Sequence, residues 1–196
     1  GAVARLARKL PFVAGPHLNI YNEAALRYYA DLGAVRWVPP LEMSGSNVAA
    51  VHAGRPAGMQ TELFAYGRMP LALSARCFTA RHYGLAKDDC QYRCLDHPDG
   101  ILLSTREGQP FLAINGIQTQ SSQRYLLLDE IPALRAIGLD VLRISPQSQY
   151  MTEVIEAFDA ARRGQPAAAR AEWSPEGFCN GYWHGRPGIE LQRVPA

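Results

Sequence analysis

Short apolar runs alternate with longer segments of helical spacing through the first third of the chain. Runs of three to five apolar or β-branched residues predict strands, and apolar positions that return every three or four residues predict helices. The predicted strands are residues 12–14, 34–38 and 61–65, and the predicted helices are residues 22–31 and 46–53. Strands and helices that alternate at this spacing favour a parallel sheet of βα units.

Capping and chain-breaking residues set the ends of these elements. Asn22 is a suitable N-cap for the first helix, with Glu23 in its first turn, and Gly33 predicts its end. Ser46 is the expected cap of the second, weaker helix. Pro39 directly follows the second strand and closes it, because proline cannot donate a ladder hydrogen bond.

The middle of the chain departs from this alternation. Residues 101–104 and 111–114 are apolar runs that flank Glu107-Gly108-Gln109, which predicts a β-hairpin. Alternation then resumes with a strand at 125–128, a helix at 131–137, a strand at 141–144 and a helix at 151–163. Residues 178–188 are rich in glycine and aromatic side chains and predict an ordered loop.

These elements together predict an α/β fold, namely a partial (β/α) barrel-like fold with an inserted β-hairpin and a cysteine-rich loop. Residues 1–196 are expected to form a single domain, since their number suits one core. The chain opens at Gly1 without an initiator Met, and residues 1–9 have the pattern of the last turns of a helix. We therefore expect the chain to be the C-terminal two-thirds of a longer barrel-like protein.

Composition narrows the possible partners. The hydrophobic fraction of 47% and the charged fraction of 19% are ordinary for a globular protein. The net charge of +2 is dispersed along the chain, so no basic patch for a nucleic-acid backbone is expected. No apolar run approaches the roughly 18 residues of a transmembrane helix, and no secretory signal is evident. The sequence therefore favours a cytoplasmic protein without a transmembrane segment.

Three of the four cysteines lie close together, at Cys77, Cys90 and Cys94, in a C-x12-C-x3-C spacing. Thiolates four residues apart can face one metal, and a returning loop can add a third. Soft sulfur ligands suit an iron-sulfur cluster or zinc, and neighbouring arginines offset the charge of thiolates. Reduced, partly buried structural cysteines are the other interpretation, and the spacing alone leaves all three open.

Several segments resemble the signature segments of the collagenase-like peptidase family, in its UbiV branch. They are Leu-Pro-Phe-Val-Ala-Gly at 10–15, Ser-Ala-Arg-Cys-Phe-Thr-Ala-Arg at 74–81, Asn-Gly-Ile-Gln-Thr at 115–119, Arg-Ile-Ser-Pro-Gln at 143–147 and Cys-Asn-Gly-Tyr-Trp at 179–183. They occur in the family's order and cover almost the whole chain.

The chain departs from the peptidase pattern at two positions. The peptidases and the sister protein UbiU typically carry His and a ligand cysteine where this chain has Tyr66 and Pro70. The resemblance to the UbiV branch implies a 4Fe-4S cluster on Cys77, Cys90 and Cys94, with a fourth cysteine ligand N-terminal to this chain. Cys179 matches a ligand of the other branches and is the fallback fourth ligand.

The resemblance also implies a function. It implies an iron-sulfur subunit of an oxygen-independent hydroxylation system in ubiquinone biosynthesis, which acts on a ubiquinone precursor as a heterodimer with a UbiU-like protein. The alternatives are a peptidase, the activity for which the family is named, and a non-catalytic scaffold for its partner. The sequence holds no Gly-x-Ser-x-Gly and no HExxH motif, which disfavours the common peptidase designs.

Four further residues have both a functional and a structural interpretation. His17 follows the first strand and either lines a barrel mouth or makes an ordinary hydrogen bond. Glu62, on a strand, is expected to contact substrate or to pair with Arg143. The aromatic pair Tyr182 and Trp183 either shields a cluster or packs the last loop.

Overall fold

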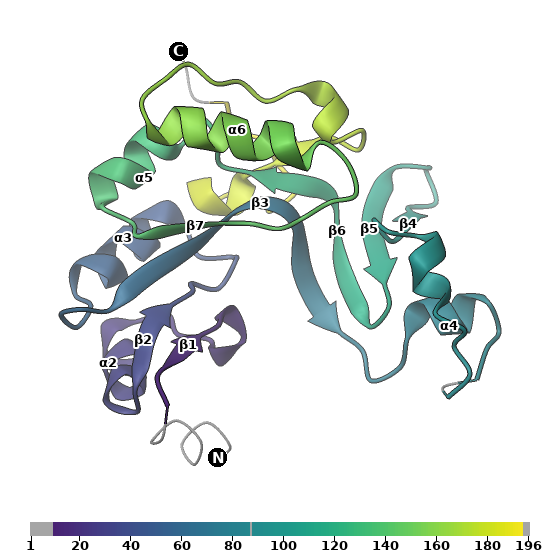
Figure 1. Ribbon diagram of the computed structural model, residues 1–196, viewed down its shortest axis with the longest axis horizontal. Helices are drawn as coiled ribbons and strands as arrows, with labels where there is room; N and C mark the ends of the chain where they lie inside the picture. The colour runs from purple at the N-terminus through teal and green to yellow at the C-terminus, as the bar shows by residue number, and fades with distance from the viewer. Residues whose placement is uncertain (1–9, 87, 194–196) are drawn as a thin grey trace. The chain divides into compact units, whose positions relative to one another are not determined.

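The computed structural model describes residues 10–86 and 88–193 (Figure 1). The helix end expected within residues 1–9 lies outside the described residues. The chain divides into two compact units, of which unit 1 comprises Gly1–Ala65, Asp129–Ile144 and Asn180–Ala196. Unit 2 comprises Tyr66–Leu128 and Ser145–Cys179. Whether the two units fold as the single expected domain stays a prediction.

Unit 1 contains the predicted parallel βα units. Strand β1 (Phe12–Ala14) pairs in parallel with β2 (Ala34–Trp37), and β2 pairs in parallel with the beginning of β3 (Gln60–Leu73). Helix α2 (Glu23–Asp31) packs against β2, and α3 (Gly45–Ala53) connects β2 to β3. The 3-10 helix η2 (Pro16–Leu18) follows β1. The alternation of apolar runs and helical segments is therefore confirmed in this part of the chain.

The remaining elements of unit 1 come from later in the sequence. Helix α5 (Ile131–Ile137) is followed by β7 (Val141–Ile144), which pairs with β3. The 3-10 helix η5 (Gly181–His184) contacts α3. The bounds of α5 and β7 confirm the predicted helix and strand. Gly138 ends α5 with a φ of 85°, a left-handed conformation that glycine adopts without strain.

Unit 2 is built around an antiparallel sheet. The second half of β3 pairs with β6 (Gln118–Leu126), β6 with β5 (Pro110–Asn115), and β5 with β4 (Ile101–Ser104), all antiparallel (Figure 1). Strand β8 (Phe178–Cys179) adds to β6 in parallel. The helices of this unit are α4 (Phe78–His82), η3 (Arg93–Asp96), α6 (Met151–Arg162) and η4 (Ala171–Trp173). The inserted hairpin is β4–β5, as predicted.

Each unit has its own buried side chains. Trp37, Leu26 and Val48 are fully or almost fully buried in unit 1. Tyr66 and Val154 are fully buried in unit 2. The Tyr66 ring packs edge-on against an aromatic ring of α6, with the two ring centroids 6.2 Å apart. None of the described helices has the length and apolarity needed to cross a bilayer.

The α/β class is confirmed, with corrections in detail. The described strands run in the open order β1-β2-β3-β6-β5-β4, so these residues form a mixed sheet and not a closed barrel. Strand β3 continues to Leu73, well past the predicted end, and β6 begins at Gln118, earlier than predicted. The cap of α3 is Ser44, whose hydroxyl accepts from the Asn47 N–H at 3.4 Å, and not Ser46.

A close backbone approach explains the glycine in the middle of β3. Gly67 has a φ of 121°, and a Cβ there would lie 2.6 Å from the Ser145 Cβ. The Ser145 N–H donates to the Tyr66 carbonyl at 2.8 Å, so the segment after β7 lies directly against this point of the strand. Glycine here allows that contact, and it does not end the strand.

Candidate functional site

The candidate site is the segment of residues 77–99, here called the cysteine segment, which lies in unit 2 between β3 and β4. It contains Cys77, Cys90 and Cys94, and the structure describes all of it except residue 87. All three side chains are partly exposed and carry free thiols. The thiols are therefore accessible from solvent while their backbone is held in place by short helices and turns.

Cys77 is fixed at the beginning of α4. Its Sγ accepts a hydrogen bond from the Ala80 N–H at 3.4 Å and so acts as the helix N-cap. The first turn of α4 is tied to the turn between β5 and β6, because the Phe78 N–H donates to the Gly116 carbonyl at 2.7 Å. The Gly116 N–H in turn donates to the Thr79 hydroxyl at 3.2 Å. The turn between β5 and β6 therefore positions Cys77.

Cys90 and Cys94 flank a tight turn. The Arg93 N–H donates to the Cys90 carbonyl at 3.2 Å, and Cys94 lies within the 3-10 helix η3. Gln91 and Tyr92 both have a φ of 51°, in the left-handed region that non-glycine residues seldom enter. Two consecutive residues in that region reverse the chain between the two cysteines.

Helix α4 contacts η3, so Cys77 and Cys94 come from adjacent short helices. Among the described residues, however, no three His, Cys, Asp or Glu side chains meet at a point where one metal ion is held. The donor chemistry fits a sulfur-ligated metal group, since three partly exposed thiols are available within one segment. The structure thus brings together the short helices at Cys77 and Cys94. Among the described residues, the three thiols do not meet at one point.

Cys179 has a different environment. It lies in β8 beside Tyr125 of β6, and its side chain is only 1% exposed. Burial raises the pKa of its thiol to about 12, so the thiol stays protonated at neutral pH. Cys179 packs in the sheet of unit 2, apart in sequence from the cysteine segment.

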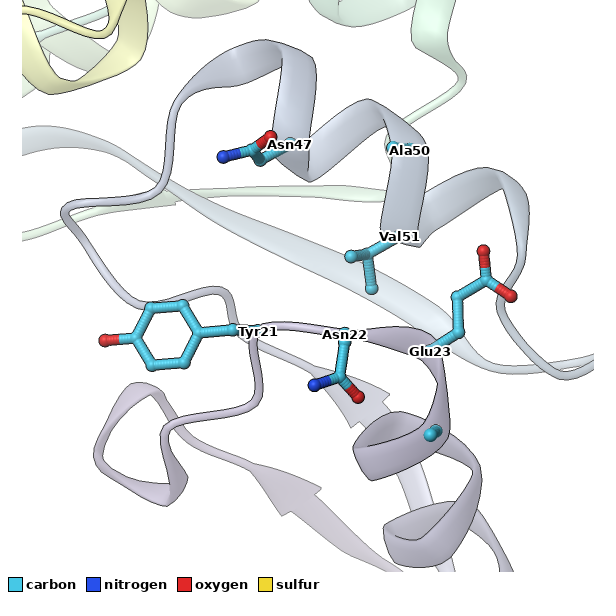
Figure 2. A pocket seen from close by; sticks show the side chains of 7 residues that line it. Tyr21, Asn22, Glu23, Asn47, Ala50 and Val51 are labelled. Atoms are coloured by element: carbon cyan, nitrogen blue, oxygen red, sulfur yellow. The ribbon is translucent and has the colours of Figure 1, made fainter.

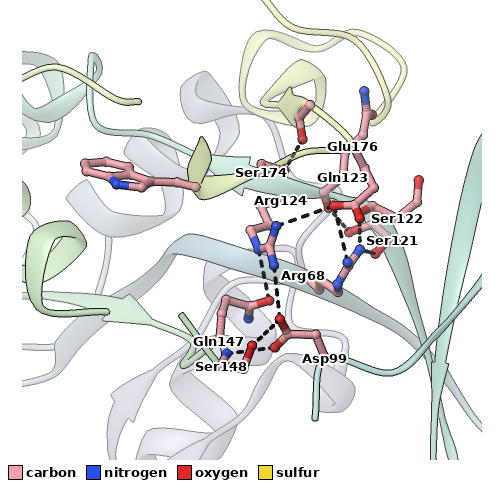
Figure 3. A network of polar contacts seen from close by, with 12 residues as sticks. Arg68, Asp99, Ser121, Ser122, Gln123, Arg124, Gln147, Ser148, Ser174 and Glu176 are labelled. Atoms are coloured by element: carbon pink, nitrogen blue, oxygen red, sulfur yellow. Dashed lines mark hydrogen bonds and ion pairs between the residues drawn. The ribbon is translucent and has the colours of Figure 1, made fainter. Parts of the chain in front are cut away.

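The C-terminal end of the cysteine segment is held by a polar network around two buried arginines (Figure 3). A carboxylate oxygen of Asp99 lies 3.4 Å from a guanidinium nitrogen of Arg124, whose side chain is 7% exposed. The same carboxylate accepts from the Ser148 N–H at 2.8 Å and from its hydroxyl at 2.6 Å. Arg124 also reaches Gln147 at 3.1 Å and Glu176 at 3.4 Å. Five residues beyond Cys94, the chain is thus fixed to β6 and to the segment after β7.

Arg68 is the second buried arginine of this network. One terminal nitrogen lies 3.4 Å from Glu176, and the other donates to the Ser121 carbonyl at 3.2 Å and to that of Ser122 (Figure 3). Its Nε is buried without a partner among the described residues. Burial lowers the pKa of the guanidinium from its ordinary value, and the carboxylate of Glu176 opposes that shift. The network therefore balances two cations with two carboxylates.

Sequence reasoning did not single out this network. Its members are far apart in the chain, and 52 residues separate Arg124 from Glu176. The available signal was Arg68 within the otherwise apolar run of residues 63–73, because a charged side chain in such a run needs a buried partner.

Tyr66 stands where the resemblance places a histidine of the peptidases, and it is completely buried. Its hydroxyl donates to the Trp173 carbonyl at 3.4 Å. Burial is the main cause that raises the pKa of the phenol, so Tyr66 is no base at neutral pH.

Glu62 pairs with two arginines on the sheet of unit 1. It accepts from Arg36 at 3.0 Å and from the Nε of Arg143, and its side chain is 5% exposed. The expected contact with Arg143 is therefore confirmed, and it forms part of a three-residue ion cluster. His17, in contrast, is exposed on η2.

The aromatic pair in η5 packs inside unit 1. A Cβ on Gly45 would lie 2.6 Å from the Trp183 ring, and one on Gly188 would lie 2.5 Å from the Tyr182 ring, so both rings rest on glycine backbone. The packing role is confirmed by these contacts, and the shielding role stays a prediction.

Two further features of unit 1 carry groups that are capable of binding or catalysis. An open pocket lies between the beginning of α2 and one side of α3 and is lined by Tyr21, Asn22, Glu23, Ala24, Asn47, Ala50 and Val51 (Figure 2). Asn22 is already engaged as the N-cap of α2, with its Oδ1 2.9 Å from the Ala25 N–H. The second feature is a histidine–hydroxyl pair, in which the Nδ1 of His52 lies 2.9 Å from the Oγ1 of Thr61.

Comparison with known proteins assigns the chain to a family. The sequence matches the model of peptidase family U32 over residues 2–192, which is almost the whole chain. No solved structure matches the chain with significance. The chain belongs to peptidase family U32, as its resemblance to the collagenase-like peptidases predicts.

Proposed function

We propose that the chain is part of an iron-sulfur subunit in an oxygen-independent hydroxylation system of ubiquinone biosynthesis, as in the UbiV branch of the family. Its partner in this proposal is a UbiU-like protein, with which it forms a heterodimer, and its substrate is a ubiquinone precursor. The observation that carries the proposal is the cysteine segment itself. Three partly exposed thiols lie within one segment that is anchored at both ends.

The protein's own residues suit a redox-active sulfur-ligated group. When bound, a 4Fe-4S cluster supplies one-electron chemistry at a potential set by its ligands, hydrogen bonds and burial. Cys77, Cys90 and Cys94 are the proposed ligands in this chain. Arg76, Arg81 and Arg93 are exposed around them and offset the negative charge of the thiolates.

The proposed reaction turns a ring C–H bond into a C–OH bond, which removes two electrons from the ring. Without O2, the oxygen comes either from water, with two electrons and two protons passed to an acceptor, or from an oxygen-atom donor that is itself reduced by two electrons. A group that passes one electron at a time suits this chemistry better than it suits peptide hydrolysis, in which no electron is transferred.

The peptidase alternative requires a nucleophile beside a base. The pair of His52 and Thr61 has the right separation, but Thr61 is 0% exposed and His52 is 4% exposed. Burial is the main cause that lowers the pKa of His52, which therefore stays neutral at pH 7. A peptide bond does not reach a completely buried hydroxyl, so this pair supports a structural role.

Growth and quinone analysis test the proposal. Cells that lack the full gene should make ubiquinone normally in air and accumulate an under-hydroxylated precursor without oxygen. Complementation by variants with Cys77→Ala or Cys94→Ala should fail, whereas Cys179→Ala, the matched control, should restore most of the ubiquinone. Normal anaerobic ubiquinone in the deletion strain would refute the functional assignment.

The alternatives give different outcomes in the same experiment. A peptidase would leave anaerobic ubiquinone unchanged in the deletion strain. A scaffold would tolerate the cysteine substitutions as long as the variants still bound the UbiU-like partner, which co-purification measures. Full-length protein purified without oxygen should contain about four iron atoms per chain, as a 4Fe-4S cluster requires. Stoichiometric zinc in place of iron would contradict the proposal.

A further inference from the structure

The two halves of the cysteine segment are joined by a set of side chains outside the proposed ligands. Tyr83 follows the last residue of α4, and His97 follows the last residue of η3. The Tyr83 hydroxyl lies 2.7 Å from the Nε2 of His97, across 14 residues of chain. The two rings face each other with their centroids 5.9 Å apart and their planes at 30°.

Arg93 adds a third member to this contact. Its guanidinium carbon lies 5.6 Å from the centroid of the Tyr83 ring, which is within range of a cation–π interaction. A carboxylate oxygen of Asp96 lies 3.5 Å from a nitrogen of the same guanidinium and forms an ion pair with it. One aromatic ring of the α4 half is thus held by two side chains of the η3 half.

These contacts close the loop between the two halves of the cysteine segment. The described residues between the two halves are mostly exposed, and Cys90 lies among them. Closing a flexible loop costs conformational entropy, which must be offset wherever its ends meet. The hydrogen bond, the ring contact and the cation–π contact supply that compensation between the α4 half, which carries Cys77, and the η3 half, which carries Cys94. They use neither thiol.

The left-handed turn between Cys90 and Cys94 is a second, independent sign. Gln91 and Tyr92 both keep a φ of 51°, which costs free energy for residues that carry a Cβ. Such a conformation persists only where the surrounding structure imposes it. Closure of the loop is the constraint that fits, because η3 begins directly after this turn.

We propose that Tyr83, His97 and Arg93 form a clamp that positions the cysteine-bearing elements for metal binding, with these three as positioning residues and not ligands. The inference rests on the proposed function for the identity of the bound group, a 4Fe-4S cluster. Side chains that orient ligands contribute strongly to metal retention, and their loss typically weakens it by about tenfold or more.

The first test uses the iron-free full-length protein. A short thiol-reactive cross-linker, added to a variant that keeps Cys77 and Cys94 and carries Cys90→Ser and Cys179→Ala, should join the two thiols rapidly. Adding Tyr83→Phe removes the hydroxyl and keeps the ring, and adding His97→Leu removes both bond and ring contact. Cross-linking should slow several-fold in the first and further in the second.

The second test uses the anaerobically reconstituted protein. Iron release to a chelator should be about tenfold faster in Tyr83→Phe and His97→Leu, and the reduction potential should shift in both. His97→Gln restores a hydrogen-bonding side chain and should recover part of the iron retention. Tyr28→Phe and His17→Gln, at exposed positions of unit 1, are the matched controls and should behave like the wild type.

The outcomes separate this inference from the proposed function. A wild-type protein that takes up no iron would refute the proposed function, while the cross-linking rates would still decide on the clamp. If the wild type binds iron and the clamp variants match it in cross-linking, iron release and potential, the clamp is refuted and the proposed function stands. Lower thermal stability with unchanged iron release and potential would show a merely structural role and also refute the clamp.

Discussion

Asp99 is the residue through which the structure fixes the end of the cysteine segment, and its replacement has a calculable cost. Its carboxylate accepts two hydrogen bonds from Ser148, at 2.8 and 2.6 Å, and faces Arg124 at 3.4 Å. Hydrogen bonds to a charged group contribute about 1.5–3 kcal/mol each when buried. Because Asp99 is 27% exposed, we expect a smaller total, about 2–3 kcal/mol for Asp99→Ala.

Arg124 limits the damage, since it keeps Glu176 and Gln147 as partners after the substitution. The isosteric variant Asp99→Asn keeps one oxygen that accepts from the Ser148 N–H, and it replaces the oxygen that faces Arg124 and the Ser148 hydroxyl by an uncharged NH2 group. It should therefore cost about 1 kcal/mol, less than half the effect of Asp99→Ala. The difference between the two variants measures how much of the anchor is hydrogen bonding and how much is charge pairing.

Urea unfolding followed by circular dichroism measures these costs, and hydrogen exchange locates them. Protection of the Ser148 N–H should fall in Asp99→Ala, because its acceptor is gone, and the Gly100 N–H, which donates to the His97 carbonyl at 2.9 Å, should exchange faster as the anchor loosens. Protection of the α2 amides in unit 1 should change only with global stability. Equal unfolding free energies for wild type and Asp99→Ala would refute the reasoning.

Two further predictions concern unit 2. Gly67→Ala should destabilise the protein by about 3 kcal/mol, because of the positive φ and the close contact with Ser145. In the double variant, Ser145→Gly should remove the steric part of this loss. Additive losses of the two substitutions, measured by thermal unfolding, would contradict this prediction. For Cys179, the folded-state pKa of about 12 exceeds its ordinary value of 9.0, so its contribution to stability is complete below pH 9 and is lost as the pH rises towards 12. Wild type and Cys179→Ala should converge in unfolding free energy over that interval, and a constant difference would rule out the titration of Cys179.

Local signals predicted the short elements well. The Asn22 cap and the Gly138 stop each act within one turn of helix, so a single residue decides the boundary. The polar start of β6 carried no apolar alternation, and residues 118–123 form a strand because β3 and β5 pair with it on either side. Such pairing is a tertiary effect, which outweighs local propensity.

In the candidate site, too, local features are predictable from the sequence and long-range contacts are not. The spacing of Cys77, Cys90 and Cys94 identifies the thiols, because metal ligands cluster along the chain. The anchors of the cysteine segment are long-range contacts, such as those from Asp99 to Arg124 and to Ser148, 49 residues away. Neither hydrophobic periodicity nor motif spacing contains information on such pairs.

The burial of Tyr66 and the exposure of the thiols are what the proposed function requires. Tyr66, where the peptidases typically have a histidine, is completely buried, and its hydroxyl is committed to the Trp173 carbonyl. A hydrolase needs a base that exchanges protons with water and substrate, and a group in this position does neither. The partly exposed thiols lie instead in the cysteine segment, which the β5–β6 turn holds at one end and Arg124 holds at the other. A segment fixed at its ends and adjustable between them suits the entry of a metal group, since ligands must move together on binding without losing their support.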